Sequence, residues 1–343
     1  MSKKQRINWD NLGFNAYETK SMFIAKFNSA GKCLDKGLVP YGDIKLSPAA
    51  SVLNYGQGVF EGTKAYETSK KHVVFFRLED NAKRLNNSCL RLCMPKIPKK
   101  MFVRAVKDTV FDNIEFIPKK DQGSLYIRPL LFGSGPDLGV KPSSNYTFLV
   151  YVTPVGSYFQ SGLKSLNVFV TDKYHRVASK SIGFAKAIGN YSSTLLPYRE
   201  IKEAGYDEIV FLNASNENII DEARSANIFV LKDRILKTPP TNGSILPGIT
   251  RDSVLKIGKT IFDLNVREED ITLKDLMNSD EVFFTGTAVI IAPVGSITFN
   301  NKKYAYKSSY SDSMTNQIRE TLIDIQNENI EDPFGWISPL NDK

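Results

Sequence analysis

Residues 183–191 read GFAKAIGNY, and this stretch sets Lys186 among small side chains, with Gly183 before it and Gly189 after it. Small neighbours allow a flat ligand to approach the lysine amine closely. Desolvation or a neighbouring cation favours the neutral amine, which can form a Schiff base with a carbonyl and later carry a proton. The same residues are also compatible with an ordinary exposed lysine. The segments that follow help to decide between the two.

A pair of carboxylates follows in residues 219–229, which read IIDEARSANIF. Asp221 and Glu222 precede a strand that we expect to begin at Asn227. One of these carboxylates could pair with a pyridinium nitrogen, and a protonated pyridine ring stabilises a carbanion at the α-carbon of a substrate. The alternative is two exposed acids at a turn.

Two later segments have the pattern of anion-binding turns. Residues 245–254, ILPGITRDSV, predict a strand end, a Pro-Gly turn and a helix start, with Thr250 or Asp252 in the cap or the first turn. The first amides of such a helix, together with the Thr250 hydroxyl, suit a phosphate. Residues 283–288, FFTGTA, predict a strand that enters a small-residue turn at Thr287. Each signal is weak alone, since ordinary capped helices share the first pattern.

The rest of the chain alternates strand-like and helical patterns without a repeat, which indicates a mixed α and β class. The expected strands cover 23–27, 73–76, 124–132, 146–152, 166–171, 209–212, 227–231 and 281–285, and the expected helices cover 78–92, 192–203, 250–261 and 314–325. The stretch 156–164 contains Gly, Ser and Gln and predicts a linker. We therefore expect an α/β or α+β pair of domains, 1–155 and 165–343.

Composition argues against several other classes. The 343 residues carry a net charge of +8, but the basic residues are interleaved with 37 acidic ones, which favours a solvated surface over a nucleic-acid-binding patch. The N-terminus lacks the apolar region of a secretory signal, and no apolar run approaches the roughly 20 residues of a membrane-spanning helix. Three cysteines, Cys33, Cys89 and Cys93, and two histidines, His72 and His175, predict neither a disulfide framework nor a metal site. We expect a cytoplasmic protein.

In this order, the segments resemble those of the fold type IV pyridoxal-phosphate enzymes, and most closely those of the branched-chain amino acid aminotransferases. The resemblance implies that pyridoxal 5′-phosphate is the cofactor and that Lys186 carries it. It also implies that Tyr191 hydrogen-bonds the ring hydroxyl and that Glu222, rather than Asp221, meets the ring nitrogen. The phosphate-binding residues that it implies in this half are Ile249, Thr250 and Thr287.

The resemblance extends into the first half of the chain. Residues 77–85, RLEDNAKRL, place Arg84 where the family has an arginine for the cofactor phosphate. Asp80 and Arg84 are also four apart on the expected helix and would suit a surface ion pair. The residues that the resemblance assigns to the substrate are Tyr55, Phe60, Tyr126, Arg128, Tyr158, Thr287 and Ala288. A buried aromatic core would explain the aromatic ones almost as well.

The implied activity transfers an amino group between L-leucine, L-isoleucine or L-valine and 2-oxoglutarate. One pocket must then accept a branched aliphatic chain and a glutamate chain, which requires aromatic walls and a cation such as Arg128. A small N-terminal α/β domain, a larger C-terminal pseudo-barrel domain and a homodimer are also implied. The alternatives are a D-amino acid aminotransferase, an aminodeoxychorismate lyase and a non-catalytic basic binding protein.

Overall fold

The computed structural model describes residues 7–156, 165–308 and 311–340. The chain divides into two compact units. The first comprises Met1–Gln160, Ala185–Ile188 and Asp324–Lys343, and the second comprises Ser161–Phe184 and Gly189–Ile323. The expected domains, 1–155 and 165–343, differ from these units because the segment around Lys186 and the end of the chain belong to the first unit. Most of the expected linker, 157–164, lies outside the described residues.

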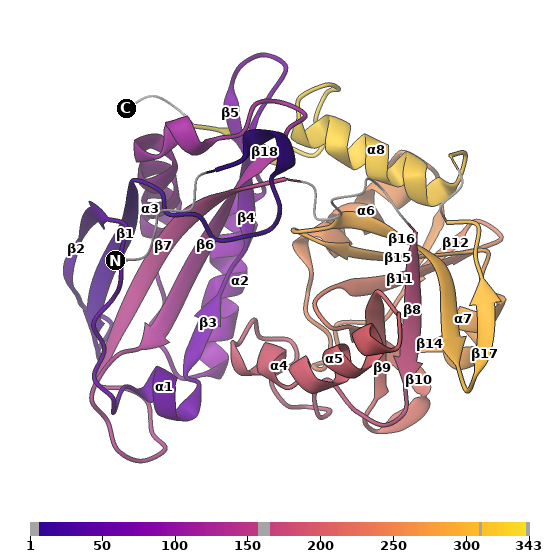
Figure 1. Cartoon of the computed structure of the whole chain (residues 1–343), viewed down its shortest axis with the longest axis horizontal. Coiled ribbons are helices and arrows are strands. Elements are labelled where there is room, and N and C mark those ends of the chain that lie inside the picture. The colour runs from indigo at the N-terminus through magenta and orange to yellow at the C-terminus, as the bar shows by residue number, and fades with distance from the viewer. Residues whose placement is uncertain (1–6, 157–164, 309–310, 341–343) are drawn as a thin grey trace. The chain divides into compact units, whose positions relative to one another are not determined.

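The first unit is built on an antiparallel sheet with the strand order β18-β5-β4-β6-β7-β1-β2, in which β3 also pairs with β6 (Figure 1). Its strands are β1 (Ser21–Asn28), β2 (Cys33–Pro40), β3 (Gly58–Phe60), β4 (Thr63–Glu67), β5 (Val73–Phe76), β6 (Ser124–Gly133), β7 (Asn145–Val155) and β18 (Ile337–Pro339). The pairing of β18 with β5 is what joins the end of the chain to this unit.

Helices α2 (Leu78–Arg91) and α3 (Lys99–Asp112) complete the core of the first unit, and a short helix, α1 (Ser51–Tyr55), precedes β3. Helix α3 packs against β1 and β7, while α2 packs against α3 and β3. The helices bury Leu85 and Phe102 against Phe75 and Phe148 of the sheet. Each such side chain contributes about 2–3 kcal/mol when it is removed from water.

The second unit contains a sheet with the strand order β13-β12-β11-β15-β16-β8-β9-β10-β14, and β17 pairs with β16 (Figure 1). The strands are β8 (Leu166–Thr171), β9 (Glu208–Asn213), β10 (Asn216–Ala223), β11 (Asn227–Lys232), β12 (Ile235–Thr238), β13 (Asn265–Glu268), β14 (Ile271–Thr272), β15 (Glu281–Gly286), β16 (Ile290–Phe299) and β17 (Lys302–Ala305). Its helices are α4 (Gly189–Ser192), α5 (Leu195–Glu203), α6 (Ile249–Thr260) and α7 (Leu273–Asn278), and α8 (Met314–Gln326) runs from this unit into the first.

The strands and helices expected from the sequence are present, within a few residues at their ends. One difference concerns 192–203, where α5 begins only at Leu195 and Ser192 is the last residue of a separate short helix, α4. The Lys99–Asp112 helix was not expected from the sequence, although its buried Phe102, Val106 and Val110 recur at helical spacing. None of the helices in the described part of the chain combines the length and the apolar character that a membrane-spanning helix needs.

Candidate active site

Lys186 lies beside β3 in the first unit and is half-buried. Its carbonyl accepts a hydrogen bond from the Phe60 amide at 3.1 Å. Its ammonium nitrogen, Nζ, is 4.7 Å from the centroid of the Phe60 ring. The alternative of an ordinary exposed lysine is therefore wrong, because both the main chain and the side chain of Lys186 contact β3.

Phe60 also contacts a second cation. The Arg128 guanidinium carbon lies 4.7 Å from the centroid of the same ring, and Arg128 Nη2 donates to the Tyr126 hydroxyl at 3.1 Å. At Gly62, a Cβ atom would lie only 2.2 Å from that hydroxyl, so a larger residue there would displace the Tyr126 side chain. The first unit thus brings together four predicted residues from three separate segments, namely Lys186, Phe60, Tyr126 and Arg128.

Arg84 is buried on α2 and forms a two-pronged ion pair with Glu61. Its Nε and Nη2 donate to the two carboxylate oxygens at 2.8 and 2.7 Å, and Asn81 Nδ2 donates to the same carboxylate at 2.8 Å. Burial raises the pKa of Glu61, but Arg84, and to a smaller extent Lys186 and Asn81, outweigh it and hold that pKa below its ordinary value. Asp80 pairs with Arg77 at 2.7 Å, so its ion-pair partner is Arg77 and not the Arg84 of the alternative interpretation.

In the second unit, Glu222 is 3% exposed and lies within β10. Its carboxylate pairs with Arg176 at 2.5 Å and accepts from Asn227 Nδ2 at 2.8 Å and from the Leu246 amide at 3.3 Å. Arg176 is also buried, and its Nη2 donates to the Ser244 carbonyl at 2.7 Å. Glu222 is therefore a fixed carboxylate with a buried cation beside it.

Asp221 is equally buried, but it has a different environment. It accepts from Asn213 Nδ2 at 2.9 Å and from the Ser244 hydroxyl at 3.2 Å. Burial raises the pKa of Asp221, and these hydrogen bonds offset only part of that effect. The alternative of two exposed acids at a turn is wrong for both residues, since both side chains are buried within a strand.

The predicted anion site at the start of α6 has no side-chain cap. The N-cap residue is Gly248, so neither Thr250 nor Asp252 occupies the cap, and Thr250 lies in the first turn with 6% exposure. The first amides of a helix lack an acceptor within the helix and carry the positive end of its dipole. A Cβ atom at Gly248 would lie 2.0 Å from Asn227 Oδ1. Since Asn227 also binds Glu222, this side chain joins the helix start to the buried carboxylate.

The remaining predicted residues fall in several places. Tyr191 lies on α4, Ile249 is the first residue of α6, and Thr287 and Ala288 lie in the turn between β15 and β16. In the first unit, Tyr55 ends α1 with 41% exposure, and its hydroxyl accepts from the Gly139 amide at 2.9 Å. Tyr158 lies outside the described residues.

Sequence reasoning missed three residues that hold the predicted ones in place, namely Glu61, Arg176 and Asn227. Each lies in or near a segment with predicted site residues, but the sequence alone does not show that its charged or amide side chain is buried. Their partners are 23, 46 and 5 residues away. Adjacency of Glu61 to Phe60 and Gly62 was the available signal for the first of them.

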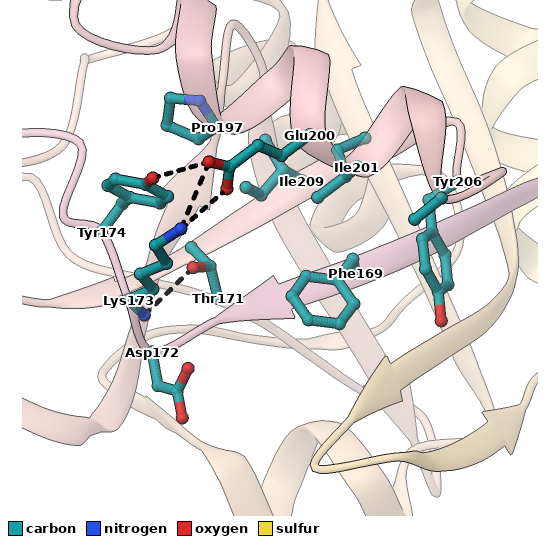
Figure 2. Close-up of a pocket in the computed structure, with 11 residues that line it drawn as sticks. Phe169, Thr171, Asp172, Lys173, Tyr174, Pro197, Glu200, Ile201, Tyr206 and Ile209 are labelled. Carbon is teal, nitrogen blue, oxygen red and sulfur yellow. Dashed lines mark hydrogen bonds and ion pairs between the residues drawn. The ribbon is translucent and has the colours of Figure 1, made fainter.

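A surface pocket of about 280 Å³ lies elsewhere in the second unit, between α5 and the strands β8 and β9 (Figure 2). Phe169, Tyr206 and Ile209 line its apolar part, and at its rim Lys173 and Tyr174 bond Glu200. It contains none of the predicted site residues. The described residues contain no cluster of His, Cys, Asp and Glu able to hold a metal ion.

Comparison with known proteins places these features in a family. Residues 58–297 match the family model for amino-transferase class IV. The chain is 42% identical over 335 residues to branched-chain-amino-acid aminotransferase 2, chloroplastic, of Arabidopsis thaliana, covering 98% of this chain and 86% of the relative. It is 42% identical over 340 residues to branched-chain amino acid aminotransferase 1, mitochondrial, of Humulus lupulus, covering 99% and 86%. A methionine aminotransferase of Arabidopsis thaliana is 38% identical over 334 residues, which cover 97% of this chain and 94% of that relative.

The expected cytoplasmic location is contradicted by these relatives, which are named chloroplastic and mitochondrial. That expectation rested on amino-acid composition, which does not indicate the compartment in which a protein is located. The cysteines of the described residues are unpaired, but reduced thiols are found in organelles as well as in the cytosol.

A solved structure shows the same fold. The branched-chain amino acid aminotransferase of T.th., complexed with N-(5′-phosphopyridoxyl)-L-glutamate, is 28% identical, has a TM-score of 0.78, and covers 94% of this chain and 99% of its own. The family match and the near full-length relatives identify the same family. The chain therefore belongs to the class IV aminotransferases and, within them, to the branched-chain aminotransferases.

Proposed function

We propose that this aminotransferase moves an amino group between a branched-chain L-amino acid and 2-oxoglutarate. The observation that carries the proposal is the grouping around Phe60. One aromatic ring contacts both the amine of Lys186 and the guanidinium of Arg128. An apolar wall suits the branched chain, and the guanidinium suits the second carboxylate of glutamate. The names of the plant relatives and the glutamate adduct bound to the T.th. enzyme support the same substrates.

The donor set fits pyridoxal 5′-phosphate. The uncapped start of α6 and the Thr250 hydroxyl suit a phosphate group, and Glu222, buried beside Arg176, suits a protonated ring nitrogen. Thr285 lies opposite Asn227 in the sheet, and its buried hydroxyl has no hydrogen-bond partner among the described residues, which also supports a polar ligand in this part of the second unit. When bound, the cofactor supplies a carbonyl that takes up the amino group and a ring that accepts electrons.

Each residue has a defined role in this proposal. Lys186 would hold the cofactor through its amine, and the freed amine would accept the proton of the substrate α-carbon. Glu222 keeps the ring nitrogen protonated, and Tyr191 orients the ring through its hydroxyl. The phosphate is held by Arg84, Ile249, Thr250 and Thr287. The substrate is held by Tyr55, Phe60, Tyr126, Arg128, Tyr158, Thr287 and Ala288.

We also propose that the active form is a homodimer. In the first unit, Leu138 and Val140 are 87% and 89% exposed, and Tyr55 bonds Gly139 between them. Two neighbouring aliphatic side chains in water are unfavourable, which supports burial of this loop against another copy of the chain.

The test is a visible spectrum of the purified protein. A band that bleaches on addition of L-leucine and returns on addition of 2-oxoglutarate supports the proposal, and the Lys186→Ala variant is expected to lose both responses. Absence of a chromophore, or a response to D-alanine but not to L-leucine, would contradict it. Because one relative is named for methionine, L-methionine belongs in the same titration. A rate that is much higher with methionine than with leucine would change the assigned substrate but not the reaction.

A further inference from the structure

The segment Ala185–Ile188 belongs to the first unit, although the chain on both sides of it belongs to the second. Two main-chain hydrogen bonds hold it beside β3. The Ile188 amide donates to the Gly58 carbonyl at 3.1 Å, and the Phe60 amide donates to the Lys186 carbonyl at 3.1 Å. Lys186 is thus carried by the edge of the first unit's sheet.

The main-chain pairing between this segment and β3 is interrupted at the amide of Lys186. In a hydrogen-bonded antiparallel pair, two opposed residues exchange both bonds. Phe60 and Lys186 form one of these bonds, but the amide of Lys186 donates to Ser88 Oγ at 2.8 Å. A side chain from α2 therefore takes the place of the strand carbonyl at the one residue whose amine reacts.

Ser88 is well suited to this contact. It is 1% exposed, and its hydroxyl donates to the Arg84 carbonyl at 3.1 Å, one helical turn earlier. A serine hydroxyl has one donor and two acceptor positions, so it can donate to Arg84 and accept from Lys186 at the same time. The next polar side chains along this edge of α2 are Arg84 and Asn81, which both bind Glu61. This edge of α2 thus supports β3 and Lys186 together.

We propose that Ser88 is a positioning residue for Lys186, fixing the main chain that carries the reacting amine. This inference rests on the proposed function, in which Lys186 transfers the proton. The amine must reach the same atoms in both half-reactions, and a small displacement of a reacting group lowers the rate. Because Ser88 acts through Lys186 and not through the substrate side chain, its loss slows the leucine and glutamate half-reactions to the same extent.

The first measurement is residue-resolved amide hydrogen exchange on the full-length protein as purified. In Ser88→Ala, the amide of Lys186 loses its acceptor, and its exchange is expected to accelerate about 10- to 100-fold, the factor that corresponds to an unsatisfied buried donor. Ser88→Thr retains the oxygen and is expected to restore protection. The matched control is Thr109→Val, since Thr109 is buried on α3 and bonds the Ala105 carbonyl one turn earlier, as Ser88 bonds Arg84.

The second measurement is the rate of each half-reaction by rapid mixing. Ser88→Ala is expected to lower both rates about 10-fold or more, with apparent substrate affinities within about twofold of the original values. Unchanged exchange at Lys186 overturns the inference, and so does faster exchange throughout the first unit, which a general loss of stability would produce. Fast exchange at Lys186 with unchanged half-reaction rates overturns it as well. If the unsubstituted protein performs no transamination, the proposed function fails instead, and the exchange data still report the Ser88 bond.

Discussion

At the scale of single residues, the two units use the same arrangement. Glu61 is held by Arg84 in the first unit, and Glu222 is held by Arg176 in the second, with all four side chains buried. Removing one partner of such a pair leaves an uncompensated charge and costs about 3–5 kcal/mol, whereas the intact pair adds little net stability. We therefore interpret both pairs as serving to orient their carboxylates and guanidinium groups rather than to stabilise the fold.

The first prediction concerns Arg128. Arg128→Met removes the cation beside Phe60 while keeping an unbranched side chain over the ring. The expected loss in kcat/KM is about 10- to 100-fold for L-glutamate, which corresponds to one hydrogen-bonded charge pair, and only a few-fold for L-leucine. Steady-state kinetics with both substrates measure it. Arg104→Met, on the exposed side of α3, serves as the control. Equal losses for both substrates would refute a role in dual recognition.

The second prediction concerns Lys64 on β4, which is 6% exposed. Burial lowers its pKa from 10.5 to about 8. Between these two values the unfolded chain binds more protons than the folded one, so stability rises as the pH increases through that range. Below about pH 8, burying the charged amine is expected to cost about 3 kcal/mol.

The change in the free energy of unfolding that Lys64→Met causes should therefore be more favourable at pH 7 than near pH 10.5, by about 3 kcal/mol. Urea denaturation at the two pH values measures this difference. Lys36→Met, at an exposed position on β2, is the matched control. A similar change in stability at both pH values would show that the charge is not the cause.

At the scale of elements, Asn227 connects the start of α6 to the buried Glu222. Asn227 Nδ2 binds both Glu222 and the Leu246 carbonyl, which lies just before the helix. Gly248→Ala would place a methyl group 2.0 Å from Asn227 Oδ1, so either the side chain or the loop must move.

The third prediction is that Gly248→Ala lowers stability by about 1–3 kcal/mol, as overpacking does, and weakens binding of pyridoxamine 5′-phosphate about 10-fold. Thermal unfolding and fluorescence titration measure the two effects. Gly37→Ala is the control, since a Cβ atom there meets nothing within 4 Å. Unchanged affinity would show that the link through Asn227 does not set the geometry of the phosphate site.

At the scale of the whole molecule, the exposed loop around Gly139 leads to the fourth prediction. Leu138→Ser combined with Val140→Ser should shift the protein from dimer to monomer. Burial of two aliphatic side chains contributes about 3–6 kcal/mol, which weakens association by about 100-fold or more when it is lost. Sedimentation velocity over a concentration series measures the shift. Leu34→Ser, which is 57% exposed on β2, is the control. A variant that remains dimeric would place the interface elsewhere.

The sequence by itself determined the local chemistry of this protein. Runs of β-branched and aromatic residues predicted eight strands, namely β1, β5, β6, β7, β8, β9, β11 and β15, and helical patterns predicted α2, α6 and α8, because both signals depend on residues that are close together in the chain. Three further predictions used only residues that are adjacent in the chain. They concerned the small residues around Lys186, the Pro-Gly turn before α6 and the carboxylates at 221 and 222. The order of these segments, rather than any one of them, identified the family.

The tertiary structure alone decided which residues support that chemistry. Nothing in the sequence distinguishes the buried Lys64 from an exposed lysine, or indicates that Glu61 bonds Arg84 and that Ser88 bonds Lys186. These contacts join residues that are 23 and 98 positions apart. Burial, pairing and pKa depend on what surrounds a side chain in space, and for these residues folding brings that environment from distant parts of the chain.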